Sequence, residues 1–329
     1  MTIHNDAGSF EAALRLCASC DDVRILRRVR PISELVNDGP PIGSTRRIAI
    51  VDTETTSVDV QTAEVIEIAA AVVLVDEAGE VRAIETALRG LRDPGVPIPA
   101  EVQRLTGISD DDVAGRGLNE PRWEALLGGS DLIVAHNAAY DAPIVERLLP
   151  GIKGHAWACS MREIDWAAHG FDGAKLGHLL MQIGYFSTGH RADADVISLM
   201  HLLIHRPEGV RSLMAELVAR AAQPSLRIEA TGAPFDKRHL LKARGYRWDA
   251  REKVWWREIA EVAHEAEALW LSRDAELRAT PRVRQLSWHT RQRYGGGPRC
   301  SGRASSEASG RPNPQRSHEQ EVATSLFPE

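Results

Sequence analysis

Apolar residues along the chain form short continuous runs and helical stripes that together predict an α/β domain over residues 46–206. The first three runs follow one another closely, so they read as antiparallel strands, and helical spacing follows each of the later runs. A sheet that starts as a meander and continues with alternating strands and helices is a mixed central sheet flanked by helices. The predicted strands are 46–53, 64–75, 81–88, 131–137 and 155–160.

The residues on either side of this domain have different patterns. Residues 9–30 read as one amphipathic helix with its continuation, within an N-terminal extension and linker over 1–45. Two segments then follow the domain: 207–224 reads as a helical linker, and 225–277 reads as a small α+β module built from a strand, helices and a hairpin. From 278 to 329 the chain is rich in Arg, Ser, Gly and Pro and loses its periodicity, which predicts a disordered basic tail.

The first strand ends in two carboxylates. "IAIVDTETT" begins with four apolar residues, typical of a strand covered on both faces, and continues with Asp52 and Glu54. Side chains alternate along a strand, so these two acids point the same way, about 7 Å apart along the chain. Two like charges at the end of a buried strand are unfavourable unless a cation or solvent compensates them. This stretch alone leaves open a solvated strand end or a cation site.

Two later segments supply further acids and a histidine. Asp141 in "HNAAYDAPIV" follows a predicted strand and lies at the start of a helix, where a carboxylate is favoured. Asp195 in "HRADADVISL" lies one turn into the last helix of the domain. His190 precedes it by five residues, and Gly189 favours placing His190 in the loop before the helix. Asp193 is a competing candidate for the role of Asp195, but the spacing from His190 favours Asp195.

Four carboxylates and one histidine from separate segments match the needs of two-metal phosphodiester hydrolysis. Mg²⁺ and Mn²⁺ prefer carboxylate oxygens and retained waters, so the sequence predicts two such ions. His190 suits a general base at neutral pH because an unperturbed imidazole has a pKa of about 6.5.

"IVDTETT", "HNAAYD" and "HRADAD" resemble, in this order, the three motifs of the DEDDh 3′→5′ exonucleases, whose best-known member is the proofreading epsilon subunit of bacterial DNA polymerase III. The resemblance covers about 46–206 and implies a ribonuclease H-like exonuclease fold. It implies that Asp52 binds both metals, that Glu54 and Asp195 complete the tighter site, and that Asp141 serves the second metal. His190 corresponds to the base of the family.

The resemblance also implies residues that contact the substrate. "PIPAEVQRLTGIS" is similar to a segment of the family that wedges the terminal nucleoside, which would assign that role to Thr106, Gly107 and Ile108. Thr55 would lie beside the 3′ end.

Composition narrows the class of protein without changing this interpretation. The net charge is −6 and 43% of the residues are hydrophobic, as in an ordinary soluble protein. No apolar run reaches 18 residues, and the first residues lack the features of a signal peptide, so we expect a cytoplasmic protein without a membrane span. Cys17 and Cys20 form an isolated C-x-x-C, which favours surface cysteines of a helix over a redox or metal site.

The module interleaves basic and aromatic residues. This composition suits a platform for single-stranded nucleic acid, but a module of this size also needs tryptophans for its core, and the sequence leaves both interpretations open. The candidate contacts are Lys242, Arg244, Trp248, Trp255 and Trp256.

The last ten residues, "QEVATSLFPE", contain "ATSLF", whose Leu326 and Phe327 are similar to the Q-x-x-L-F peptides that bind the bacterial sliding clamp. Ala323 departs from that pattern, because it replaces the usual Gln.

The sequence therefore predicts a metal-dependent exonuclease that removes nucleoside 5′-monophosphates from the 3′ end of DNA, in replication proofreading or repair. Its expected partners are single-stranded DNA or the 3′ ends of duplex DNA, and the sliding clamp. An RNA-trimming exonuclease of the RNase T or oligoribonuclease type is the alternative, and a non-catalytic binding scaffold ranks below both. The oligomeric state is left open.

Overall fold

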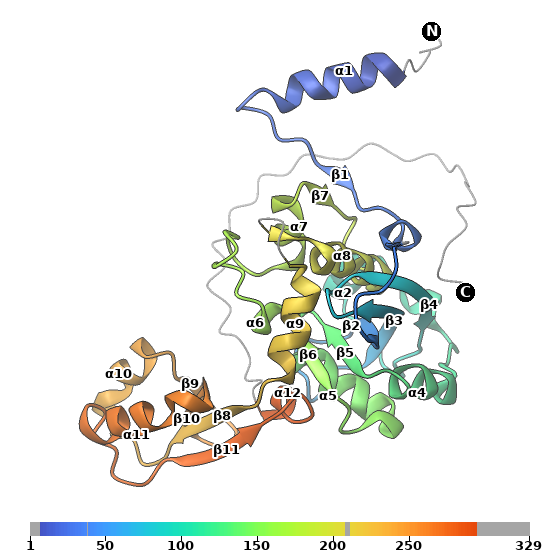
Figure 1. Cartoon of the computed structure of the whole chain (residues 1–329). Coiled ribbons are helices and arrows are strands. Elements are labelled where there is room, and N and C mark those ends of the chain that lie inside the picture. The colour runs from blue at the N-terminus through green and yellow to red at the C-terminus, as the bar shows by residue number, and fades with distance from the viewer. Residues whose placement is uncertain (1–6, 38, 208–210, 295–329) are drawn as a thin grey trace. The chain divides into compact units, whose positions relative to one another are not determined.

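The computed structural model describes residues 7–37, 39–207 and 211–294, which fall into two compact units (Figure 1). Unit 1 contains the described residues up to Pro224 together with Leu286–Arg293. Unit 2 begins at Ser225 and runs to Gln285. The proposed clamp-binding residues Leu326 and Phe327, like the rest of the tail from residue 295 on, lie outside the described residues.

A five-stranded sheet in the order β4-β3-β2-β5-β6 forms the centre of unit 1. The first three strands pair antiparallel as a meander, whereas β5 and β6 join the sheet parallel to β2. The mixed α/β architecture predicted from the sequence is therefore confirmed. The strands are β2 (Thr45–Thr55), β3 (Val65–Asp76), β4 (Val81–Leu91), β5 (Leu132–Ala135) and β6 (Trp157–Cys159).

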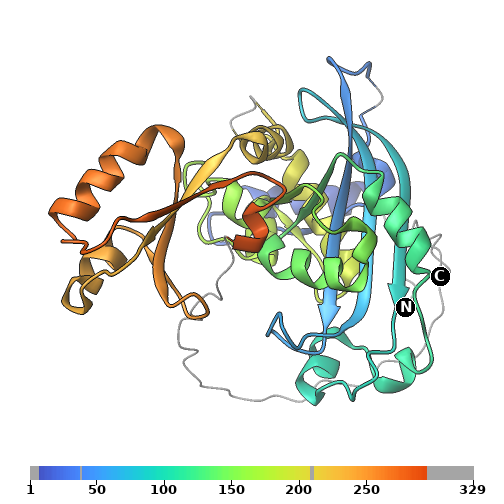
Figure 2. The same ribbon diagram turned by 90° about the horizontal axis from the view of Figure 1, so that it is seen from below.

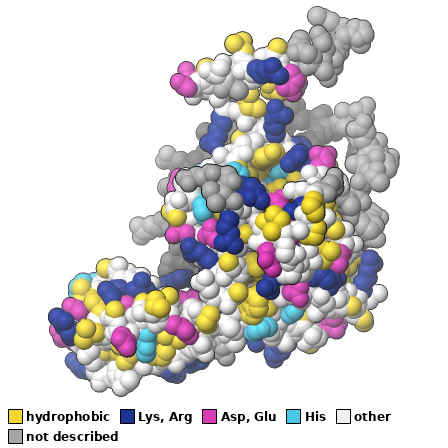
Figure 3. Space-filling view, viewed as in Figure 1, with side chains coloured by type: hydrophobic (Ala, Val, Ile, Leu, Met, Phe, Trp, Pro, Cys, Tyr) yellow, Lys and Arg dark blue, Asp and Glu magenta, His cyan; other side chains and the backbone are white. Residues whose placement is uncertain are grey.

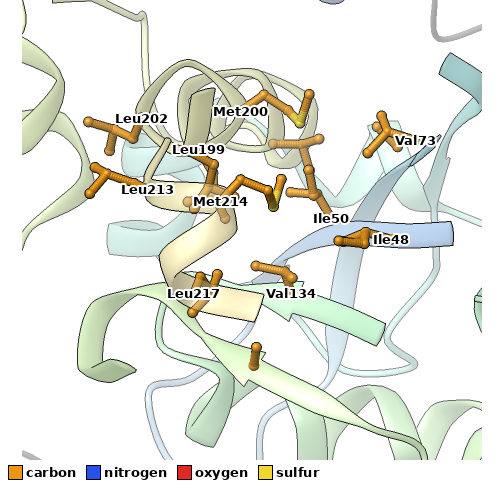
Figure 4. Close-up of a cluster of buried hydrophobic side chains, with 14 of the residues drawn as sticks. Ile48, Ile50, Val73, Val134, Leu199, Met200, Leu202, Leu213, Met214 and Leu217 are labelled. Atoms are coloured by element: carbon orange, nitrogen blue, oxygen red, sulfur yellow. The ribbon is translucent and has the colours of Figure 1, made fainter. Parts of the chain in front are cut away.

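Helices cover both faces of this sheet (Figures 1 and 2). Alternation in β2 sends Ile48 and Ile50 to one face and Ala49 and Val51 to the other, and each set packs in its own core cluster. Figure 4 shows the cluster that β2 shares with the later helices. Each fully buried Ile or Leu stabilises the fold by roughly 1.5–3 kcal/mol. The helices are α4 (Glu120–Gly128) and α5 (Ala138–Leu148) on one face, and α7 (Leu176–Gln182), α8 (Ala192–Ile204) and α9 (Leu213–Ala222) on the other.

The N-terminal helix is shorter than the sequence pattern predicted. Helix α1 is Ala7–Ala18, and the chain then leaves helical geometry. Asp21 and Asp22 follow within four residues, and negative charge is unfavourable near a helix C-terminus. Farther on, a two-residue strand β1 (Arg27–Arg28) pairs with β7 (Tyr185–Phe186). The prediction of one continuous helix over 9–30 is therefore wrong.

Helix α9 belongs to the core of unit 1, although residues 207–224 read as a linker. Leu213, Met214 and Leu217 are buried in the same cluster as Ile48 and Ile50. An amphipathic helix gains stability by covering an apolar face, and the sheet supplies that face. Smaller elements complete unit 1: α2 (Ala100–Thr106), α3 (Asp110–Val113), α6 (Ser160–Glu163), and the 3₁₀ turns Ile32–Leu35 and Pro150–Ile152.

The chain returns to unit 1 after unit 2. The Trp288 carbonyl accepts a hydrogen bond from the Trp157 N–H of β6 at 2.9 Å, and Gln292 donates to Glu163 at 2.7 Å. In helix α12 (Arg291–Tyr294), the guanidinium of Arg293 pairs with Glu146 of α5 at 2.7 Å. The returning segment thus supplies partners for two buried carboxylates.

Unit 2 is a four-stranded sheet with helices, in the strand order β11-β8-β10-β9. Ile228, Leu241 and Leu271 form the centre of its own core. The sequence placed the end of this module at residue 277, which is too early, because β11 adds a strand after that point. Most β11 residues are exposed, so the strand has no hydrophobic signature. The elements are β8 (Ser225–Ala230), η4 (Phe235–Lys237), α10 (Arg238–Ala243), β9 (Arg247–Asp249), β10 (Val254–Ala260), η5 (Glu261–Ala263), α11 (His264–Arg273) and β11 (Arg282–Leu286).

None of the helices formed by the described residues has the length and apolar character that crossing a bilayer requires.

Candidate active site

At the C-terminal end of β2, two acidic side chains point to one face of the sheet and a threonine side chain points to the other. Asp52 and Glu54 share the face of Ile48 and Ile50, which α8 covers, whereas Thr53 shares the face that α5 covers. The pairing of β2 with β3 shifts register between Glu54 and Thr55, so the strand becomes irregular just after the second acid.

Helix α8 brings a third carboxylate to these two. Carboxylate oxygens of Asp52, Glu54 and Asp195 all lie within 4.8 Å of one another. Asp193, the competing candidate, instead places Oδ2 3.2 Å from a guanidinium nitrogen of Arg89. The three clustered acids come from two segments that are far apart in sequence, as the sequence analysis expected.

Asp141 approaches from the opposite face of the sheet. It lies in the first turn of α5, which follows β5 directly through Asn137, a residue with a left-handed φ of 84°. The Thr53 hydroxyl donates to Asp141 Oδ1 at 2.8 Å, which fixes this carboxylate beside β2. Asp141 is buried, and its charge is the largest single charge acting on Asp52. Asp141 therefore lies near enough to Asp52 to repel it, but outside the group of three acids whose oxygens converge.

Burial and mutual repulsion make these carboxylates hard to ionise when no cation is bound. Burial, with the charges of Asp141, Asp195 and Glu54, raises the pKa of Asp52 well above its usual value. Burial followed by the charge of Asp195 raises the pKa of Glu54 to about 8. Burial raises the pKa of Asp141 to about 7, against the Thr53 hydrogen bond, and that of Asp195 to about 6, against the charge of His190.

His190 occupies a strained position directly before α8. It is exposed, and its φ of 57° lies in the left-handed region that non-glycine residues seldom adopt. Its N–H donates to Asp195 Oδ2 at 3.2 Å, so the histidine is tied to a member of the acidic cluster. Such strain at a polar site is typical of functional residues.

The donor set suits a hard divalent cation. Oxygen ligands without thiols or imidazoles among the three clustered groups favour Mg²⁺ or Mn²⁺ over softer metals. The raised pKa values of Asp52 and Glu54 also indicate a cation site, because a bound cation would relieve the repulsion that raises them. Asp52, Glu54 and Asp195 can therefore hold a divalent cation.

The four residues assigned to substrate contact have different environments. The Thr55 hydroxyl donates to the Ser57 carbonyl at 3.0 Å and accepts from the Tyr140 hydroxyl. The buried Thr106 ends α2, and Gly107 follows with a left-handed φ of 70°. Ile108 is buried in a small core cluster. The exposed apolar side chain of this segment is Leu105, with 55% of its surface accessible.

In unit 2 the aromatic candidates divide into exposed and buried rings. Trp248 is 49% exposed, and its ring lies 5.6 Å from that of the partly buried Trp255. The Lys242 ammonium lies over the Trp255 ring at 5.8 Å. Trp256 is only 1% exposed, so its ring is not free to stack on a base in this structure. Arg244 pairs with the buried Glu267 at 3.0 Å.

Several residues that hold this site together have no motif in the sequence that marks them. Thr53 orients Asp141, and Tyr140 contacts Thr55. The fully buried Glu67 lies directly opposite Glu54 on β3. A single charge in the otherwise apolar run "IEIAAAVVLV" was the available signal, because a buried charge requires a partner.

Comparison with known proteins gives one match in sequence and several in structure. Residues 49–203 match the RNase T family model, whose description is "Exonuclease". No curated protein matches the chain. The matched segment 49–203 contains all four acids and His190.

Two solved structures are among those that resemble part of the chain. Exonuclease X in complex with 5′-overhanging duplex DNA is 22% identical with a TM-score of 0.37, and the match covers 51% of this chain and 99% of that one. E. coli exonuclease I in complex with single-stranded DNA, in a zinc-bound form, is 15% identical with a TM-score of 0.41. That match covers 56% of this chain and 48% of exonuclease I, so it spans about half of the latter.

Proposed function

We propose that this domain is a metal-dependent 3′→5′ exonuclease that hydrolyses DNA and releases nucleoside 5′-monophosphates. The observation that carries the proposal is the convergence of Asp52, Glu54 and Asp195 within 4.8 Å, with Asp141 beside them. The exonuclease family match over 49–203 supports the reaction class. The five-residue spacing from His190 to Asp195 supports the DEDDh group within it.

The roles of the residues follow from their positions. Asp52, Glu54 and Asp195 would hold one divalent cation, and Asp141 would serve a second together with Asp52. When bound, these cations supply Lewis acidity for water activation and for the leaving oxygen. His190 accepts the proton of the attacking water, whose oxygen forms the new bond to phosphorus while the bond to the 3′ oxygen breaks.

The test compares matched single strands of DNA and RNA that carry a label at the 5′ end. A 3′→5′ exonuclease shortens the labelled strand stepwise in Mg²⁺ or Mn²⁺ and stops when a chelator is added. We expect faster shortening of DNA, because a basic and aromatic second unit suits a repair or replication enzyme. Faster shortening of RNA would favour the RNA-trimming alternative, and no shortening of either strand would refute the proposal.

His190→Ala tests the proposed base. We expect kcat to fall by roughly 10²–10⁴-fold, the range that a positioned general base contributes. Mn²⁺ binding measured by calorimetry should remain within a few-fold, because His190 is outside the group of three clustered ligands. His155→Ala is a suitable control, since that imidazole contacts the Leu127 carbonyl instead of the acidic cluster. An unchanged kcat would exclude His190 as the base.

We also propose that unit 2 binds single-stranded nucleic acid. Trp248 and Phe235 are exposed by 49% and 79%. Arg238 of α10 lies over the Phe235 ring, and Lys242 of α10 lies over Trp255, the ring next to Trp248. Figure 3 shows Lys and Arg side chains beside hydrophobic ones on the surface of this unit. Exposed rings can stack on bases while the cations neutralise phosphates.

Trp248→Ala should weaken binding of a single-stranded oligonucleotide by about 5- to 150-fold, since stacking contributes about 1–3 kcal/mol per base. Fluorescence anisotropy at two salt concentrations measures the affinity and its electrostatic part. Val262→Ala is the matched control, because Val262 is a 95% exposed apolar residue of the same unit. Equal affinities of the two variants would count against the platform. The buried Trp256 is expected to act in folding instead.

The sliding clamp is a further proposed partner. The proposal rests on Leu326 and Phe327 in "ATSLF" alone. An apolar pair within a polar segment can dock in an apolar groove, where the burial of its side chains offsets the entropy lost on ordering. Binding there would place the exonuclease in replication proofreading or repair.

A further inference from the structure

Glu67 is a fully buried carboxylate within an apolar strand. It lies in β3, directly opposite Glu54 of β2 and beside Leu91 of β4. Its exposed fraction is 0%. A buried charge is strongly unfavourable unless ion pairs and hydrogen bonds satisfy it.

The partners of Glu67 come mostly from the start of α8. Arg191 donates from Nε to Oε2 at 3.0 Å and from Nη2 to Oε1 at 2.7 Å, a two-pronged arrangement with a fixed direction. The Ala192 N–H donates to Oε2 at 3.0 Å. Arg89 of β4 adds a longer contact of 3.5 Å to Oε1.

Glu67 therefore caps the N-terminus of α8, which has no side-chain cap of its own. The residue before α8 is Arg191, whose side chain makes no capping hydrogen bond. Helix N-termini need acceptors for their first N–H groups and favour negative charge. Glu67 supplies both from a strand that lies 124 residues earlier in the chain.

The capped segment contains the reactive residues. His190 precedes Arg191 directly and ties its own N–H to Asp195, which lies in the first turn of α8. The hydrogen bonds that Arg191 and Ala192 donate to Glu67 restrain one side of this segment. The hydrogen bond from the His190 backbone to Asp195 restrains the other side. Without the link from Glu67, the strained backbone at His190 would lose a restraint that opposes its relaxation.

A second contact reinforces the same helix end. Arg89 pairs with Asp193 of α8 at 3.2 Å while it also contacts Glu67. The two acids and two arginines alternate in sign, so each charge has an opposite neighbour. Glu67 is fully buried and its arginine partners are partly exposed, so its loss would leave the two arginines without this common acceptor.

We propose that Glu67 is a positioning residue of the nuclease centre. It places His190 and Asp195 relative to Asp52 and Glu54, through Arg191 and the start of α8. The proposal rests on the proposed exonuclease function. It implies that loss of Glu67 affects kcat and metal affinity and leaves substrate binding nearly unchanged.

The experiment compares Glu67→Gln with Asp76→Asn. Asp76 lies at the far end of the same strand and is a buried carboxylate paired with Arg82 at 2.7 Å, so it controls for the loss of a buried ion pair. We expect Glu67→Gln to lower kcat by about 10–100-fold and to raise the half-saturating Mn²⁺ concentration similarly, with KM within about threefold. Asp76→Asn should lower the melting temperature but keep kcat within about threefold.

Arg191→Lys is the second variant, in case Glu67→Gln does not fold. Lysine keeps the positive charge but cannot reproduce the two-pronged contact. It should lower kcat by about tenfold at a nearly unchanged melting temperature. The proposal is overturned if kcat in either variant stays at the wild-type value. It is also overturned if Asp76→Asn lowers kcat as much as Glu67→Gln does.

Calorimetric titration with Mn²⁺ separates this proposal from the proposed function. If the wild-type protein trims no oligonucleotide, the proposed function fails, and Mn²⁺ binding then tests Glu67 without turnover. Weaker Mn²⁺ binding in Glu67→Gln but not in Asp76→Asn would support the positioning role. Equal binding in all three proteins would refute it.

Discussion

Replacing Asp52 by Asn is expected to abolish DNA trimming while it raises the melting temperature of the metal-free protein. Trimming should fall by about 10³-fold or more, because a proposed ligand of both cations is lost. At alkaline pH, where these acids ionise, the stability should rise because one of four acids that repel one another becomes permanently neutral and keeps its shape. Single-turnover assays in Mg²⁺ and thermal denaturation in a chelator measure the two effects.

A substitution that lowers activity but raises stability identifies a charge that serves function. Loss of a structural charge would lower the stability instead. The matched control is Asp131→Asn, which changes an exposed acid near the start of β2, where Asp131 Oδ2 accepts the Arg47 N–H at 2.7 Å. It should leave the trimming rate within a few-fold. If Asp52→Asn lowers the melting temperature in chelator, or retains trimming, the assignment of Asp52 as a ligand is wrong.

Adding Mg²⁺ or Mn²⁺ should stabilise the protein, and more so at pH 8 than at pH 6. The pKa of Glu54 rises from 4.5 to about 8 on folding, so its contribution to stability is fully present below 4.5 and is lost as the pH passes through about 8. Asp141 and Asp195, with pKa values of about 7 and about 6, act in the same direction. The metal-free protein should therefore lose stability as the pH rises from about 5 to 8.

Bound cations reverse this loss because they bind the ionised acids of the folded state. At a concentration of about 100 times Kd they add about 2.7 kcal/mol, or roughly 5–10 °C for a domain of this size. Thermal denaturation with and without Mg²⁺ at several pH values measures the difference. A shift that is equal at pH 6 and pH 8 would show that cations bind elsewhere, and Asp52→Asn should reduce the shift.

The parts of the structure that sequence predicted are those with a local signal. The run of apolar residues before Asp52 and Glu54 marks both the strand and its acidic end within nine residues. Helix α8 likewise carries its apolar stripe and Asp195 together. The fold class and the convergence of these three acids follow from such patterns, because alternation and helical spacing fix directions locally.

The parts that sequence did not predict depend on distant or exposed partners. Glu67 and Arg191 are 124 positions apart, and neither has a neighbour in sequence that indicates the pair. Strand β11 is mostly exposed, so its hydrogen bonding to the sheet gives no hydrophobic pattern. The burial of Trp256 beneath Arg227, whose guanidinium lies 4.3 Å from the ring, was equally inaccessible to reasoning from residue types.

The return of the chain at Leu286–Arg293 makes unit 2 an insertion and not an appendage. During synthesis, unit 1 cannot be completed until the ribosome has passed Arg293, because Gln292 and Arg293 supply partners for Glu163 and Glu146. A chain truncated after Pro224 would leave those two buried acids without these partners, an unfavourable state. A minimal nuclease should therefore join Pro224 to Leu286 through a short linker. For the same reason, one proteolytic cut within unit 2 leaves both fragments anchored in unit 1.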